Sequence, residues 1–329
     1  MDLSLDLSQW REEPLGVAYR RATIVTVGLR QLIRTRFFRV LLAIAWVVGS
    51  LMAAFGFLFT QSVASGGWLD SLASNFGPRG HALALSLSAV VLLYPDICIG
   101  TLFTALFWLQ SWFGLWLSLI ALTALVPGLV TRDRASNALT IYLSRPLTSA
   151  DYLLGKLGII AGTIVLLWTG PLFLGWLLSI AFAPDRNFLV YSFGPLMRAL
   201  LFNGIGLAAL AGISLGVSAV ARSSRTAIVL WLGLWLVAGI VAAPPFMPAF
   251  VRRASFSNDL IQIRQEVFRL DEALTAAGDQ LPILDRQIAS RLDRAGENAR
   301  PMDFTGALAG LAVLTGLSSV VFLRKLRPE

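Results

Sequence analysis

The chain offers few residues that could do chemistry. It has one histidine, His81, and one cysteine, Cys98, which excludes an internal disulfide framework and the usual cysteine or histidine metal sites. No G-x-x-x-x-G-K-[ST] phosphate loop occurs, since Lys156 of the Gly-Lys step is followed by Leu157. The H-E-x-x-H and G-x-S-x-G motifs are also missing. We therefore expect no catalytic residue, metal or cofactor in this chain, and no ATP binding by it.

Polar or aromatic side chains within apolar stretches are the remaining candidates. Asp96 is the one carboxylate inside such a stretch, and a charge in a membrane commonly marks a functional site. Asp96 also follows a proline, so capping the outer end of a span explains it more simply. Trp108, Trp112 and Trp116 recur every four residues, which fits a lateral gate for an apolar substrate, a lipid-facing stripe or plain packing. For Asn203 an interhelical hydrogen bond is simpler than a substrate contact.

The composition places these residues in an integral membrane protein. Of the 329 residues, 56% are hydrophobic and only 14% are charged, against roughly 25% charged in soluble domains. The net charge of +8 lies mostly beside apolar segments, so anionic lipid headgroups are a better partner for it than nucleic acid. The first 14 residues contain no apolar core typical of a cleaved signal.

Six apolar segments predict an all-α protein with six transmembrane helices. They are Val40–Thr60, Ile97–Val130, Leu157–Ala183, Pro195–Ala221, Thr226–Ala243 and Phe304–Leu323. Ala82–Tyr94 is too short to cross at about 1.5 Å per residue. It fits a re-entrant or interfacial helix, or an outward extension of the next span. Three G-x-x-x-G patterns, starting at Gly158, Gly212 and Gly306, predict close helix packing within the chain or between copies.

The N-terminal residues 1–39 combine a polar tail with a basic amphipathic stretch. In Leu15–Arg39 apolar residues such as Ile24 and Leu32 can share one face while arginines reach toward water. This pattern predicts an amphipathic helix lying in the membrane interface. Simple positive flanking charge is the alternative.

The segment Val130–Gly158 is a charged interruption between two membrane-length apolar segments, so it must lie in water. Leu139, Tyr142 and Leu143 have the i, i+3, i+4 spacing of one helix face. An Arg-Pro step ends this short helix. Thr148–Asp151 is a capping-box pattern that starts the next helix.

This part of the chain resembles the permease subunits of type-2 ABC exporters. The resemblance covers about Val126–Gly162 and includes the Arg132-Asp133-Arg134 step and the run LSRPLTSADYLLGK. In that family the segment joins the second and third spans and forms a coupling helix on a separate ATPase. The resemblance implies that the coupling residues within 131–156 are Arg132, Asp133, Arg134, Leu139, Tyr142, Leu143, Arg145 and Pro146. It also implies an N-terminal elbow helix, ATP and Mg²⁺ on the partner ATPase, and a second permease copy or sister subunit.

Charge predicts the orientation in a plasma (bacterial inner) membrane. The N-terminal stretch, the coupling segment, the Arg222–Arg225 loop and the C-terminal end are basic, whereas the short connections on the other side hold only Arg79, Arg186 and Arg198. Because short cytoplasmic loops are enriched in Lys and Arg, both termini are expected in the cytoplasm.

The long excursion 250–303 lies between the fifth and sixth spans. Leu260, Ile263, Val267, Leu270 and Leu274 are spaced as a short heptad seam. A second seam follows after a break at Gly278–Pro282, which predicts an extracytoplasmic helical hairpin. We expect its charged residues mostly to face solvent. They include Arg264, Glu266, Arg269, Asp271, Glu272, Asp285 and Arg286. The hairpin fits a lid on its own membrane domain or a docking site for an extracytoplasmic accessory protein.

The function that fits these features best is the membrane-spanning permease of an ABC exporter, which forms the substrate pathway. The pathway candidates are Asp96, Trp108, Trp112 and Asn203. One alternative is a membrane anchor or docking protein for an extracytoplasmic complex. Another is a polytopic lipid-modifying enzyme, although the paired acidic or histidine groups it needs are scarce. The substrate is not indicated by any motif.

The predicted topology can be tested by thiol labelling in a background where Cys98 is replaced. A cysteine at Ser136 should react with an impermeant reagent only after the inner side is opened, because positive-inside charge places this segment in the cytoplasm. A cysteine at Gly278 should react in intact cells. The reverse pattern would overturn the six-span arrangement.

Overall fold

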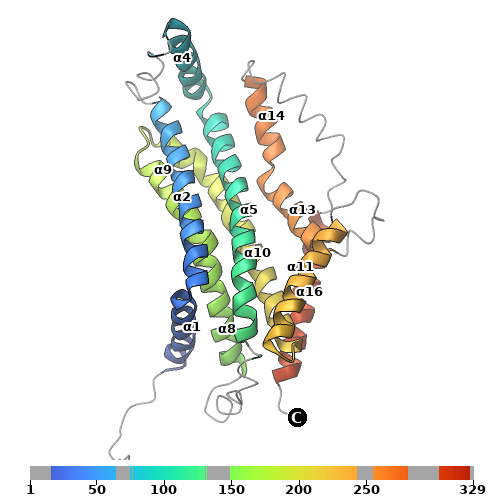
Figure 1. The fold of residues 1–329 in the computed structure, drawn as a ribbon. Coiled ribbons are helices and arrows are strands. Elements are labelled where there is room, and N and C mark those ends of the chain that lie inside the picture. The colour runs from blue at the N-terminus through green and yellow to red at the C-terminus, as the bar shows by residue number, and fades with distance from the viewer. Residues whose placement is uncertain are drawn as a thin grey trace, which may run out of the picture.

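The computed structural model describes residues 16–63, 75, 77–129, 131, 149–242, 255–280 and 304–326. All regular structure in these residues is helical, as the sequence predicts (Figure 1). The physical reason is that a helix satisfies its backbone hydrogen bonds internally, which a lipid environment requires.

Five helical segments among the described residues are long and apolar enough to cross a membrane. They are α2 (Arg36–Val63), α5 (Pro95–Leu129), the continuous run of α8 (Ser149–Ile164), η2 (Val165–Thr169) and α9 (Gly170–Ala181), α10 (Asn187–Val220) and α16 (Phe304–Leu326). The predicted fifth span corresponds to α11 (Ser224–Ala242), which is a shorter apolar helix. Each of the six predicted segments is therefore mostly helical in the residues that the structure describes.

The two longest helices, α5 and α10, exceed the thickness of a bilayer. They have 35 and 34 residues, or about 50 Å each, against a hydrocarbon core of about 30 Å. The shorter α11 and α16 lie beside their C-terminal halves, since Trp231 Nε1 of α11 donates to the Leu119 carbonyl of α5 and Gly212 of α10 faces Thr315 of α16. The N-terminal parts of α5 and α10 therefore extend past α11 and α16, toward the end that carries α4 and α14 (Figure 1).

The short apolar segment before α5 continues that helix. It forms α4 (Gly77–Leu93), and α5 follows after a bend at Tyr94. Helical hydrogen bonds run through the bend, from Tyr94 N to Val90 O at 2.9 Å and from Cys98 N to Tyr94 O at 3.1 Å. The segment is therefore a helical continuation of α5, and its position relative to a membrane stays a prediction.

The centre of the bundle is organised around Trp168 in the π-helical turn η2. Its side chain is fully buried and lies against Gly114 of α5 and Gly206 of α10. The indole also packs edge-on against Phe202, with ring centroids 5.7 Å apart. Because glycine has no side chain, both long helices approach the indole closely. A Cβ at either glycine would overlap it.

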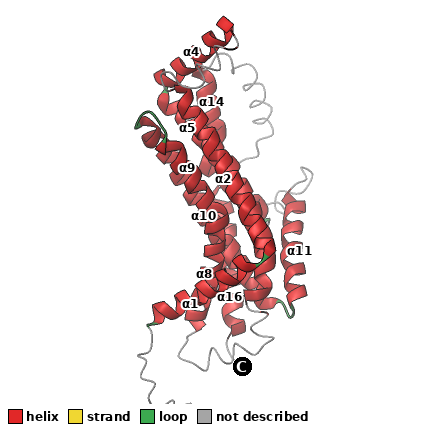
Figure 2. Cartoon of the chain, turned by 60° about the vertical axis from the view of Figure 1, so that its left-hand side comes forward, coloured by secondary structure: helices red, strands yellow, loops and turns green. Residues whose placement is uncertain are grey.

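The N-terminal helix α1 (Val17–Arg34) forms where an amphipathic helix is predicted. Its extended C-cap, Thr35, with ψ of 136°, separates it from α2. Figure 2 shows α1 turned away from the α2 axis at the lower end of the bundle, beside α8.

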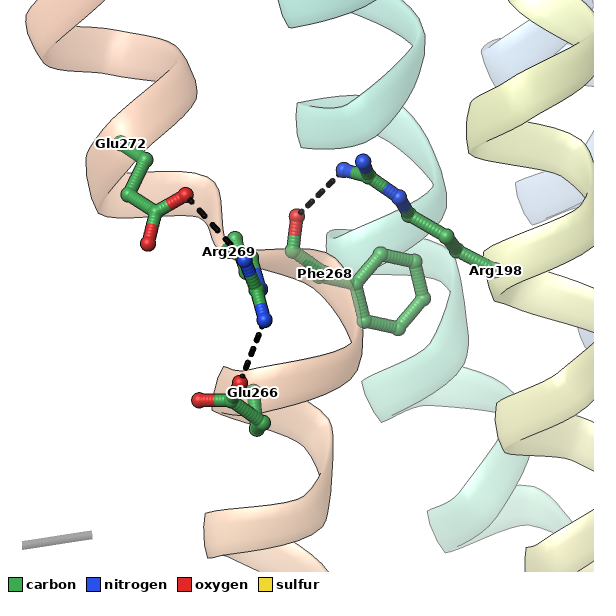
Figure 3. Close-up of polar contacts among 5 residues, drawn as sticks. All are labelled: Arg198, Glu266, Phe268, Arg269 and Glu272. Atoms are coloured by element: carbon green, nitrogen blue, oxygen red, sulfur yellow. Dashed lines mark hydrogen bonds and ion pairs between the residues drawn. The ribbon is translucent and has the colours of Figure 1, made fainter. Parts of the chain in front are cut away.

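The described part of the long excursion differs from the predicted hairpin. The prediction of one continuous helix over the first seam is wrong. Two helices, α13 (Phe256–Phe268) and α14 (Leu270–Gln280), are separated by Arg269, whose φ of 47° is left-handed. Figure 3 shows the Arg269 guanidinium between Glu266 and Glu272, while Arg198 of α10 donates to the Phe268 carbonyl at 3.4 Å. The second predicted helix lies outside the described residues.

The seam of α13 is buried by the bundle. Leu260, Ile263 and Phe268 are at most 2% exposed, and α13 packs on α16, α10 and α11. Next along the chain, α14 packs on the N-terminal part of α5, where Thr101 Oγ1 donates to the Ala273 carbonyl at 3.0 Å. The apolar face therefore finds its partner in helices that the chain already provides.

The close packing around Trp168 predicts that Gly114→Leu destabilises the protein, because a fully buried indole has no room to move. Overpacking of this kind costs about 1–3 kcal/mol, measurable as a lower Tm of the purified chain in detergent. Gly233→Leu on α11 is the matched control, since a Cβ there meets no atom within 4 Å. Equal Tm values for the two variants would contradict the packing described.

Candidate functional site

The predicted coupling residues lie outside the described residues, but both ends of their segment are described. Arg132, Asp133, Arg134, Leu139, Tyr142, Leu143, Arg145 and Pro146 are the residues concerned. The segment leaves the C-terminal end of α5 and returns at the N-terminus of α8. These two ends show how the segment is joined to the helices.

The end of α5 is tied to α8 and α10 by hydrogen bonds. Tyr152 Oη donates to the Leu129 carbonyl at 2.9 Å, and Lys156 Nζ donates to the Gly128 carbonyl at 3.4 Å. Thr131 Oγ1 donates to the Ser218 carbonyl of α10 at 3.2 Å. The last carbonyls of a helix lack partners within it, so these side chains stabilise the end of α5 and fix it to its neighbours.

The start of α8 is tied to the amphipathic helix α1. Arg21 Nε donates to Asp151 Oδ1 at 2.7 Å, and the Asp151 carboxylate is buried. Gly155 and its neighbours on α8 lie directly under α1 side chains, with Ile24 over Gly155. Gly158 and Gly162, one of the predicted small-residue patterns, face α1 in the same way. The pattern therefore serves packing within the chain.

A second site is a cavity of about 230 Å³ between α5, α10, α11 and α13. Its lining is mostly aromatic and aliphatic, with a single charged group. The residues are Trp112, Leu115, Trp116, Leu119, Phe202, Trp235, Gly239, Ser257, Leu260, Ile261 and Arg264. The cavity lies where α11 ends and α13 begins, and Ser255 Oγ bonds the Ala238 carbonyl there at 2.8 Å.

Arg264 provides the charged group of this cavity, and only 7% of the residue's surface is exposed. Its guanidinium carbon lies 3.7 Å from the ring centroid of Trp108 and 5.0 Å from that of Trp112. Nη2 donates to the Trp108 carbonyl at 2.7 Å. Burial lowers the pKa of Arg264 to about 10, so the side chain stays charged at neutral pH. Within the described ranges it forms no ion pair with a carboxylate.

The prediction that Arg264 faces solvent is wrong. Arg264 lies four residues after Leu260 and four before Phe268, on the buried face of α13. That spacing is visible in the sequence and could have placed the arginine on the apolar face. What it could not show is the aromatic surface of α5 that the guanidinium covers.

The structure brings only part of the predicted pathway set together. Trp108 and Trp112 meet at Arg264. Asp96 is exposed in the first turn of α5, which is about 24 Å along the helix from Trp112. Asn203 is buried, and its Nδ2 donates to Thr169 Oγ1 of η2 at 3.4 Å, an interhelical bond.

Arg264 can be tested for a structural or a binding role by Arg264→Met, which keeps volume and removes the charge. The lost cation–π contact, about 0.5–2 kcal/mol, is offset because a charge no longer has to be buried. We expect stability within about 1 kcal/mol of wild type, read as Tm in detergent.

The control is Leu260→Ala on the same helix face, which removes a buried side chain and should cost about 2–5 kcal/mol. A comparable loss of stability in Arg264→Met would show that the arginine mainly stabilises the fold.

The match to a family model spans both sites. A family model described as ABC-2 family transporter protein matches residues 22–325. Comparison with curated proteins returns no match. The matched range begins within α1 and ends within α16, so it takes in the described helices, the coupling segment and the cavity. The chain therefore belongs to the ABC-2 family of transporter membrane proteins.

Proposed function

We propose that the chain is the permease subunit of an ABC exporter, driven by a separate ATPase that docks on segment 131–156. Family membership is the observation that carries the proposal. The geometry at the ends of the segment supports it, because both ends are fixed to membrane helices by buried or partly buried bonds.

These bonds suggest how work at the segment would reach the membrane. A displacement of its ends acts on α5 through the Leu129 carbonyl, on α8 directly, and on α1 through Asp151. We propose that the three helices, joined by these bonds at the ends of the segment, move together. The permease needs no catalytic side chain, because it works by switching between packings while the ATPase binds ATP and Mg²⁺.

The partners follow from the same proposal. They are the ABC ATPase, a second copy of this chain or a sister permease, and the surrounding lipid of the plasma (bacterial inner) membrane. Both termini face the cytoplasm in this arrangement. The coarser statement, an integral membrane protein of a transporter family, rests on the family match and the membrane-length helices.

No observation on the described residues favours the two other functions weighed from the sequence, an anchor for an extracytoplasmic complex and a lipid-modifying enzyme. For the excursion, the lid is better supported than a docking platform, because α13 and α14 pack against the chain's own helices. Residues 281–303 of the excursion lie outside the described residues.

The coupling proposal predicts that Tyr142→Asp abolishes substrate-linked ATP turnover and leaves membrane insertion intact. A carboxylate placed in an apolar contact costs several kcal/mol of docking. The measurement is ATPase activity and co-purification of the reconstituted complex.

Tyr94→Asp makes the same chemical change at the opposite end of α5, on an exposed side chain, and should leave turnover unchanged. Normal assembly and turnover in Tyr142→Asp would refute coupling through this segment.

A further inference from the structure

Two buried hydrogen-bond donors of the cavity between α5, α10, α11 and α13 have no acceptor. Arg264 Nε and Trp235 Nε1 both lack a partner in the described part of the chain, and both side chains line the cavity. A buried donor without an acceptor is costly, so most such donors in proteins are paired. Two of them around one cavity indicate a ligand that carries acceptor atoms.

The charge of the cavity defines the kind of acceptor. Arg264 is cationic, while the other buried charged residue of α13, Asp259, is not part of the lining and faces Gly310 of α16. Glu266, on the same helix, pairs with Arg269. A ligand carboxylate or phosphate would supply the missing negative charge and would bond the guanidinium strongly.

The remaining lining defines the rest of the ligand. From Trp112 to Leu119 the cavity follows α5 over seven residues, about 10 Å, along aromatic and aliphatic side chains. Trp116 is 49% exposed, in line with Leu109, Phe113 and Ile120, a set of exposed apolar side chains on one face of α5. The cavity therefore reaches the apolar outer surface of the bundle. Indole rings are typical of the depth at which a bilayer meets water.

We propose that this cavity binds an anionic amphiphile, with its acidic head on Arg264 and its apolar chain along Trp112 and Trp116 toward Leu119. At about 230 Å³ it holds the head and the first part of a chain, since an apolar cavity of about 150 Å³ holds a benzene ring. The role of this ligand class as transported substrate rests on the proposed function. The binding itself does not.

The experiment measures binding to the purified full chain in detergent, without an ATPase. The probe is 8-bromooctanoate, whose bromine quenches tryptophan fluorescence on contact, and 8-bromooctan-1-ol is the uncharged counterpart. Wild type should bind the carboxylate saturably. Arg264→Met should weaken that binding by at least about tenfold, the effect of losing a charge-assisted hydrogen bond, and leave the weaker binding of the alcohol unchanged.

Two further variants keep the test decisive. Arg269→Met removes an exposed cation beyond the cavity and should change binding by no more than about twofold. Trp235→Phe keeps an aromatic ring and removes the N–H, so it should weaken the carboxylate several-fold even if Arg264→Met is poorly folded. A lower Tm for Arg264→Met alone does not affect this second comparison.

Three outcomes would overturn the proposal. The first is that wild type and Arg264→Met bind the carboxylate equally, and the second is that wild type binds the carboxylate and the alcohol equally. The third is that a 10-fold excess of inorganic phosphate displaces the carboxylate completely, which would indicate a small-anion site. Failure of the Tyr142→Asp test would remove the coupling mechanism and leave this binding result standing, so the two proposals fail separately.

Discussion

The packing of Trp168 between two glycines holds the long helices of this protein together. Apolar side chains gain little by meeting one another in lipid, so helices must associate through close van der Waals contact and polar bonds. The indole of η2 provides that contact for α5 and α10 at once, through Gly114 and Gly206. Phe202 then carries the aromatic contact to Phe268 of α13, with ring centroids 5.9 Å apart. These aromatic contacts join the third predicted span, which contains Trp168, to helices α5, α10 and α13.

The charged groups at the two ends of α5 differ in their physical setting. At the C-terminal end, Arg21 and Asp151 form an ion pair, and the donors of Tyr152 and Lys156 meet carbonyls that would otherwise lack partners. These groups stabilise the junction of three helices. Toward the other end, Arg264 is buried on aromatic rings, and it pairs with no carboxylate among the described residues. A buried cation with an unmet donor contributes little to stability, which is why binding is the better explanation for it.

Helix α5 connects these two settings as one continuous element. It runs from Leu129, bonded by Tyr152, to Trp108, which lies under Arg264. Between them, Trp231 of α11 bonds the Leu119 carbonyl at 3.2 Å. The cavity and the start of segment 131–156 therefore lie along the same helix.

The sequence by itself determined the helical membrane architecture. Long apolar runs must form helices in lipid, and their lengths predict where each span lies, as α2, α5, α10 and α16 show. The repeat of Trp108, Trp112 and Trp116 likewise predicts one helix face. The coupling residues are also a prediction of the sequence, and they lie outside the described residues.

The tertiary structure decided what each face meets. Helical periodicity shows that a face is apolar, but it does not distinguish a face that meets lipid from one that meets a neighbouring helix or a ligand cavity. This is why the packing of α13 on α16 and α10 could not be predicted from its seam, and why Arg264 was expected in solvent. The glycines around Trp168 and the left-handed Arg269 depend on contacts between distant segments. Such contacts arise only when the helices come together, so no local pattern of residues specifies them.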